Sequence, residues 1–183
     1  MNWYKTATNI KEVINNTSPN DRIFMTNEDS FNFRDQSSNQ ANNFKPKGLW
    51  YACGNGWLEF VMREFQTGQK KNIFQIEINP SSMLIINNSN DFVKFSNEYK
   101  VDYNGFDNMY IDWSLVAQEY SGIEISPYMA QFRMDDRHMW YYSWDVASGC
   151  IWSNDGIVDV ELIHSGIEPI EDVEPIEDDE DED

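Results

Sequence analysis

Apolar and polar residues alternate along this 183-residue chain in patterns that predict short strands and amphipathic helices. Helical spacing of apolar residues occurs in segments 6–16, 57–66, 89–99 and 110–122. Strands are expected in the short apolar or alternating runs at 22–26, 48–53, 72–79, 82–87, 123–128, 148–153 and 157–164. Several connections between these strands are too short for parallel crossovers, so the pattern favours an α+β fold.

The helix predicted at 57–66 has the clearest apolar stripe of the four. Trp57, Phe60, Val61 and Phe65 follow one another at the spacing of one helix face. We therefore expect these four side chains to face the core. The helices at 89–99 and 110–122 have plausible N-terminal caps, because short polar side chains precede their apolar residues.

Asn90 is the expected cap of the first of these two helices, and Asp112 or Ser114 that of the second.

Two stretches, 45–57 and 140–152, combine many aromatic residues with Gly, Ser and Cys. Such stretches either belong to the core or line a pocket, and the pattern by itself leaves both interpretations open.

In the pocket interpretation of the first stretch, Trp50 or Tyr51 stacks on a planar ring, and Gly54 and Gly56 let the backbone approach it. In the core interpretation the two glycines form a turn and Trp57 is buried. A phosphate-binding loop is not predicted here, because neither a lysine nor a third glycine follows at the required spacing.

Charge is concentrated at the C-terminal end of the sequence. The formal net charge is −19, and eleven of the 32 acidic residues lie between Glu168 and Asp183, where there is no basic residue. Repeated Pro and like charges predict that residues 167–183 form a disordered acidic tail after a single domain at 1–166. The acidity argues against direct nucleic-acid binding, whereas a basic protein partner remains compatible with it.

The two cysteines and two histidines do not have the spacing of a zinc site, so no metal site is predicted. The first ten residues lack the apolar core of a signal peptide, and no apolar run is long enough to span a membrane. A cytoplasmic location and reduced thiols are the expectations that follow.

Two carboxylates stand out as candidate catalytic groups. Glu124 lies between Ile123 and Ile125 on a predicted strand. It is a buried carboxylate with a raised pKa if both sheet faces are covered, or an ordinary surface acid if one face is wet. Asp145 lies between two apolar residues and is the second candidate.

Ser148 and Cys150 are conceivable nucleophiles, but His138 does not lie at a spacing that indicates activation of either.

The order of the predicted strands and helices adds a different kind of information. The segments "GLWYAC", "WLEFVMREF", "IFQIEI", "YSGIEI" and "GCIWSNDGIVDVELI" resemble, in order and in type, those of ADP-ribosyltransferase-fold proteins. The "KPKGLWY" and "WDVASGCIW" segments also resemble uncharacterised phage and large-DNA-virus proteins.

The resemblance implies a split, two-sheet α+β fold with a cleft for NAD. It implies that Trp50 and Tyr51 stack on the nicotinamide, with Trp57 beginning the helix beside it. Members of the family carry a cationic residue on their first core strand, and Arg22 is the candidate for it. Ser148 also falls in the implied cofactor site. Asp145 lies where the family's glutamate is expected, and Glu124 is the alternative from the neighbouring strand.

Two functions follow as expectations. One is an NAD-dependent ADP-ribosyltransferase that modifies a macromolecular acceptor. A variant of this expectation is a protein of the same fold that binds the nucleotide without turning it over. The other is a non-enzymatic, acidic viral protein that engages a basic partner or mimics the charge of nucleic acid.

Overall fold

A computed structural model describes residues 10–64, 72–103 and 105–166 of the protein. The α-helices are α1 (Ile10–Asn16), α2 (Gly56–Glu64), α3 (Ser89–Tyr99) and α4 (Trp113–Glu119). The strands are β1 (Arg22–Thr26), β2 (Asn42–Asn43), β3 (Leu49–Cys53), β4 (Asn72–Ile78), β5 (Met83–Ile86), β6 (Lys100–Tyr103), β7 (Phe106–Asp112), β8 (Gly122–Ile125), β9 (Ser148–Ile151) and β10 (Ile157–His164). The predicted α+β class is confirmed, and the predicted acidic tail lies outside the described residues.

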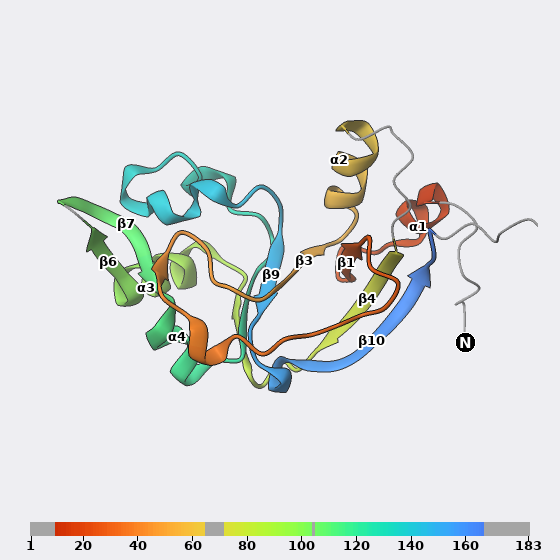
Figure 1. Ribbon diagram of the computed structural model, residues 1–183. Helices are drawn as coiled ribbons and strands as arrows, with labels where there is room; N and C mark the ends of the chain where they lie inside the picture. The colour runs from red at the N-terminus through yellow and green to blue at the C-terminus, as the bar shows by residue number, and fades with distance from the viewer. Residues whose placement is uncertain (1–9, 65–71, 104, 167–183) are drawn as a thin grey trace, which may run out of the picture.

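The strands form two sheets, as predicted. The larger sheet has seven strands in the order β10-β4-β1-β3-β9-β8-β5, and only its β5–β8 pair is parallel. In Figure 1 this sheet runs through the whole body, with α1 and α2 over one half and α3, α4, β6 and β7 beside the other. Within the described residues there is no helix long and apolar enough to cross a membrane.

The smaller sheet has three strands in the order β2-β7-β6. It was not predicted from the sequence, although residues 100–103 alternate polar and apolar positions and the Asn-Gly pair that follows is typical of a hairpin turn. The start of the helix predicted at 110–122 is instead the end of β7, and α4 begins only at Trp113. The Asp112 side chain caps α4 by accepting hydrogen bonds from the next turn, as predicted.

The larger sheet is curled rather than flat. Ile76 and Ile78 of β4 share one apolar cluster with Met83 of β5, although four strands separate β4 from β5 in the sheet order. The linker of only four residues between these two strands requires this curl. The curl encloses the sheet face that carries the cluster.

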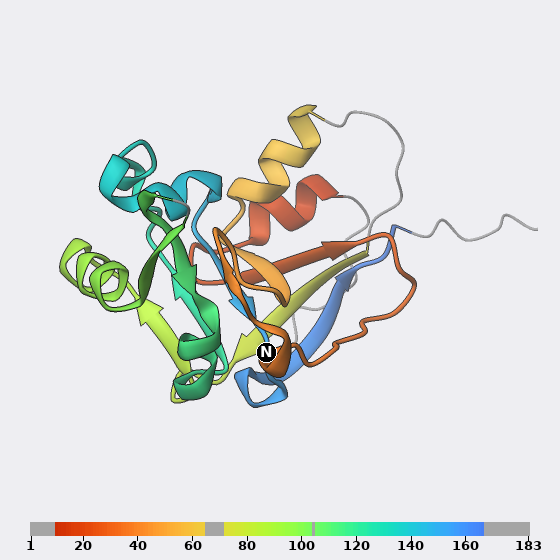
Figure 2. The same cartoon turned by 60° about the vertical axis from the view of Figure 1, so that its left-hand side comes forward.

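Helices α1 and α2 lie side by side over the other face of the same sheet (Figure 2). Val13 of α1 and Leu58 of α2 pack with Ile23 and Ile73 of the strands below them. Of the four residues predicted to face the core, Val61 is buried, Trp57 is only partly buried, and Phe65 lies outside the described residues. Leu58 and Val61 are buried, whereas Phe60 is 36% exposed and stacks on Trp57.

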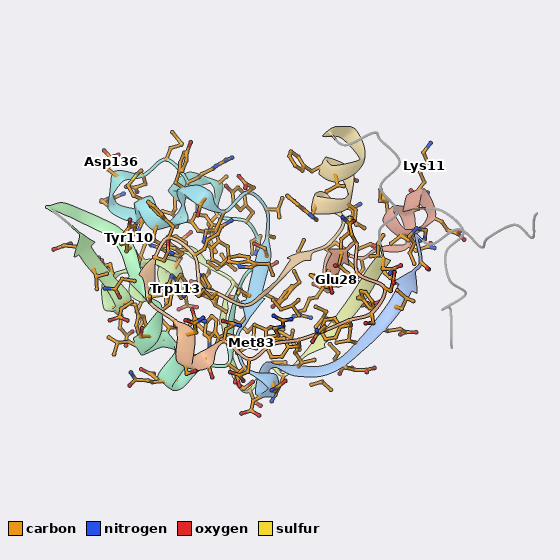
Figure 3. The ribbon with its side chains drawn as sticks, viewed as in Figure 1. Lys11, Glu28, Met83, Tyr110, Trp113 and Asp136 are labelled. Atoms are coloured by element: carbon orange, nitrogen blue, oxygen red, sulfur yellow. The ribbon has the colours of Figure 1, made fainter. Side chains whose placement is uncertain are left out.

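The core of the other half is built from aromatic side chains. Trp113, Trp140, Trp144 and Trp152 are all fully buried in one cluster with α3 and α4. Figure 3 shows Trp113 inside this half of the molecule. Most of the stretch 140–152 is therefore core. Its first residues form a 3₁₀ segment, η3 (Asp136–Ser143), that packs on β7.

The cap of α3 lies two residues before the predicted one. Asn88, not Asn90, caps α3 by accepting a hydrogen bond from the Asp91 backbone amide. On the inner face of α3, Phe92 and Phe95 are buried against Trp140.

Candidate functional site

The sheet register divides the predicted site residues between two opposite faces. Residues directly paired across neighbouring strands point to the same face, whereas consecutive residues of one strand point to opposite faces. Arg22 pairs with Cys53, and Tyr51 and Glu124 both pair with Gly149. Arg22, Tyr51 and Glu124 therefore lie on the enclosed face of the curled sheet.

The second group lies on the face covered by the helices. Ala52 pairs with both Ile23 and Ser148, and Trp50 pairs with Cys150. Because Trp50 and Tyr51 are consecutive on β3, they cannot stack on the same ring. The structure thus separates two residues that were expected to share one ligand.

On the enclosed face, Arg22, Tyr51 and Glu124 form a hydrogen-bonded group that we call the buried triad. Arg22 donates from Nε and Nη2 to the two oxygens of Glu124 at 2.6 and 3.1 Å. The Tyr51 hydroxyl donates to Glu124 Oε2 at 2.8 Å. The Glu124 side chain is 7% exposed and that of Arg22 is 26% exposed. Of the two alternatives for Glu124, the structure therefore shows the buried one.

The environment of the triad favours the protonated forms of the Tyr51 hydroxyl and the Cys53 thiol. Burial, followed by the charge of Glu124, raises the pKa of Tyr51 well above its ordinary value, so the hydroxyl keeps its proton and donates it. Burial and the same carboxylate raise the pKa of Cys53 to about 12. Burial alone raises the pKa of Cys150 well above its ordinary value. Neither cysteine is thus primed as a thiolate nucleophile at neutral pH.

Gly149 makes room for the triad on the strand between Tyr51 and Glu124. A Cβ atom at Gly149 would lie 2.3 Å from the Tyr51 ring and 2.7 Å from the Ile123 carbonyl oxygen. The Tyr51 side chain thus crosses β9 at the one place where no side chain stands, and reaches Glu124 on the next strand. The triad ties β1, β3 and β8 together.

The helical face carries a cleft of about 320 Å³ between α2 and the segment that leads into β9. Its aromatic lining comes from Trp50 of β3 and Trp57 at the start of α2. Apolar side chains form much of the remaining surface, and the polar lining groups are few. The lining residues of this cleft are Ile23, Phe24, Met25, Lys45, Trp50, Tyr51, Ala52, Trp57, Asp145, Val146 and Ser148.

Charged groups stand at the rim of this cleft. Asp145 forms an ion pair with Arg133 at 2.7 Å, and its side chain is 56% exposed. The Lys45 ammonium lies 4.9 Å from the centroid of the Trp50 ring, a cation–π arrangement. Burial lowers the pKa of Lys45, and the charge of Asp145 opposes that shift. The cleft thus combines an apolar interior with one carboxylate and one cation, and Arg133, bonded to Asp145, is not among its lining residues.

Ser148 lies in the cleft but is not activated as a nucleophile. Its hydroxyl donates to the Val146 carbonyl oxygen at 3.0 Å. His138 lies elsewhere, buried beside Ser96, with 2.9 Å between its Nδ1 and the Ser96 Oγ. The Trp140 indole N–H donates to the same oxygen at 3.0 Å, so Ser96 Oγ links the His138 and Trp140 side chains. This Ser–His pair is enclosed in the aromatic core.

The structure therefore brings Trp50, Trp57, Asp145 and Ser148 together in the cleft, and Arg22, Tyr51 and Glu124 together in the triad. The proposed catalytic carboxylates, Glu124 and Asp145, belong to different faces of the sheet.

Lys45, which lines the cleft, and Arg133, which pairs with Asp145 beside it, were missed by the sequence analysis. Lys45 opens the aromatic stretch 45–57, which offered a signal, whereas Arg133 reaches Asp145 only through the fold. Among the residues described, no group of three or more His, Cys, Asp or Glu side chains is placed to hold a metal ion. Comparisons with protein-family models, curated proteins and solved structures found no match to this chain.

Proposed function

We propose that the protein binds a ligand with a planar ring in the cleft beside Trp50 and Trp57, and that NAD is the first candidate. The observation that carries this proposal is the apolar cleft of about 320 Å³ with two indoles in its lining. That volume lies at the lower end of ligand pockets, which span roughly 300–1,000 Å³. It suits the nicotinamide riboside half of a dinucleotide, with the other half extending outside.

Asp145 is the carboxylate that can act on a ligand in this cleft. In transfer of ADP-ribose, the bond between the nicotinamide nitrogen and the ribose C1′ breaks, and its electron pair leaves with neutral nicotinamide. An acceptor nucleophile forms the new bond to C1′ and loses its proton to solvent. Asp145 would stabilise the positive charge that develops on the ribose in between.

Glu124 is a poor candidate for that role, for a structural reason. Both of its oxygens already accept hydrogen bonds from Arg22, and one of them also accepts from Tyr51. Its side chain also points away from the cleft. If the protein is a transferase, Asp145 therefore has to supply the negative charge, and Glu124 stabilises the fold.

Binding is tested first, by calorimetric titration of NAD into the full chain. We expect binding that Trp57→Ala weakens by about tenfold, because a stacked ring is worth about 1–3 kcal/mol. Leu115→Ala is the matched control, since Leu115 is a 47% exposed apolar residue of α4 that does not line the cleft. Absence of heat with the wild-type protein, together with an unchanged melting temperature, would refute the proposal.

Transfer is tested with labelled NAD and a cell lysate. We expect Asp145→Asn to reduce labelling about a hundredfold, the effect typical of losing one group that stabilises transition-state charge. Glu124→Gln should retain labelling in proportion to the fraction that remains folded, as measured by circular dichroism. Equal labelling by wild type and Asp145→Asn would remove Asp145 from the reaction. Binding of NAD without any labelling would leave a binding protein.

The second candidate function is binding of a basic protein segment. It is favoured by a second hollow of about 320 Å³, beside β10, whose lining includes Asp21, Glu77, Asp159 and Glu161. Binding of this kind weakens strongly as salt increases. A titration with polylysine at low and high ionic strength tests it, and reversal of the four acidic residues, which share the hollow with Arg22, should reduce the salt-dependent part. Binding that is unaffected by those substitutions would contradict it.

A further inference from the structure

Lys45 is a cation at the mouth of the cleft with an incomplete set of partners. Its ammonium lies over the Trp50 ring, and the side chain is half-buried. In the part of the chain that the structure describes, no carboxylate lies within ion-pair distance of Lys45. Asp145, whose charge acts on it, is already bonded to Arg133 at 2.7 Å.

Lys47, two residues further along, shows what an ordinary surface lysine of this segment does. It is exposed and donates to Asn39 Oδ1 at 3.2 Å, away from the cleft. Lys45 instead turns onto the indole that lines the cleft. The two lysines carry the same charge, so they differ only in where the fold places that charge.

A half-buried ammonium has lost part of its hydration free energy, and contact with a ring face compensates for only part of that loss. A hydrogen bond to an anionic oxygen compensates for more of it, because hydrogen bonds between charged groups are shorter and stronger than neutral ones. A ligand that places its ring in the cleft and an anionic group at the mouth would satisfy the indoles and Lys45 together. The ammonium can swing toward such a group, since its stem has four carbons.

We propose that Lys45 is the specificity-determining residue of the cleft and selects ligands that carry an anionic group next to the planar ring. This inference rests on the proposed ring-binding function and adds the chemical class of the ligand. The anion has two possible sources. It is either a phosphate one sugar away from the ring or a carboxylate on the ring itself.

The test compares two pairs of probes by calorimetry on the full chain. Nicotinamide mononucleotide and nicotinamide riboside differ by a phosphate, and nicotinate and nicotinamide differ by a carboxylate. We expect the anionic member of one pair to bind on the order of tenfold more tightly than its neutral-group partner. The pair that shows this preference identifies the source of the anion.

Lys45→Gln should reduce that preference to about one, and Lys45→Arg should retain most of it. Lys47→Gln is the matched control and should leave the preference at its wild-type value, because its charge lies outside the cleft. Unchanged melting temperatures would confirm that all three variants are folded.

Two results would overturn the inference while leaving the ring-binding function intact. One is tight binding of a ring ligand with no preference for the anionic member of either pair. The other is an equal loss of preference in Lys45→Gln and Lys47→Gln, which would assign the effect to the overall field of the protein. If neither NAD nor any of the four probes binds, the proposed function itself fails.

Discussion

The buried triad and the cleft lie back to back on the same central strands, yet they treat polar groups in opposite ways. In the triad, one carboxylate receives three hydrogen bonds from Arg22 and Tyr51 and is almost closed to solvent. In the cleft, Asp145 is more than half exposed, and Lys45 rests on an indole. Polar groups that satisfy one another hold a fold together, whereas incompletely satisfied ones remain able to interact with a ligand.

This difference also sorts the two carboxylates that the sequence presented as alternatives. Expected burial on a strand made Glu124 a catalytic candidate, but buried carboxylates also occur in structural ion pairs. What separates the two cases is the presence of an open space beside the carboxylate. Asp145 has that space, and Glu124 is surrounded by its partners.

The largest effect is expected from breaking the triad. Glu124→Gln should lower the free energy of unfolding by about 3 kcal/mol, because it leaves the Arg22 guanidinium without its counter-charge. Urea unfolding at constant m value measures this. A double-mutant cycle with Arg22→Gln should show that the two losses are not additive. A loss below about 1 kcal/mol would mean that the triad does not stabilise the fold.

The next effect comes from closing the space that Tyr51 crosses. Gly149→Ala should destabilise the protein by about 1–3 kcal/mol, because the new methyl group meets the Tyr51 ring. Gly56→Ala is the control, since a Cβ there meets only Val146 Cγ1 at 4.0 Å. It should change stability by no more than about 0.5 kcal/mol. Equal effects of the two substitutions would contradict this account.

A pH series extends the comparison to a second enclosed polar pair, Ser96 and His138. Burial lowers the pKa of His138, with the charge of Asp135 opposing the shift. The folded state therefore binds a proton less readily than the unfolded state, whose histidine has a pKa of about 6.5. This contribution to stability is complete above that pH and is lost as the pH falls below it, by at most about 1.4 kcal/mol per pH unit.

Unfolding midpoints between pH 7.5 and 5 would measure this loss. His138→Gln should have a flatter profile than wild type. Identical profiles for wild type and His138→Gln would show that the pair does not contribute to acid sensitivity.

The smallest effect on stability is expected in the cleft. Asp145→Asn and Arg133→Gln remove a largely exposed ion pair and should each change the free energy of unfolding by less than about 1 kcal/mol. The same urea titrations measure it. A loss as large as that of Glu124→Gln would erase the distinction between the two faces.

Much of the fold could be predicted from local patterns, because alternation along a strand and spacing along a helix are properties of neighbouring residues. The strands at 22–26 and 157–164 lie where the pattern predicts them. In the smaller sheet, the pairing of β2 with β7 was not predictable, because these strands are far apart in the sequence, whereas the neighbouring strands β6 and β7 carried a local signal that was missed.

The candidate site was predictable only in part. The strand period of two already separates Trp50 from Tyr51, so this division could have been made from the sequence. The grouping of Trp57 with Asp145 could not, because it depends on how α2 and the segment before β9 sit on the sheet.

The Arg22–Glu124 pair joins residues 102 positions apart in the chain. During synthesis, β1 therefore emerges long before the strand that carries its counter-charge. Non-local contacts of this kind are slow to form, because the entropy of closing a long loop is lost before the contact can stabilise the chain. The N-terminal half of the large sheet cannot complete its charge pairing on a nascent chain that ends before β8. Completion of this sheet is thus expected to wait until β8 has been synthesised, with the ion pair among the late steps of folding.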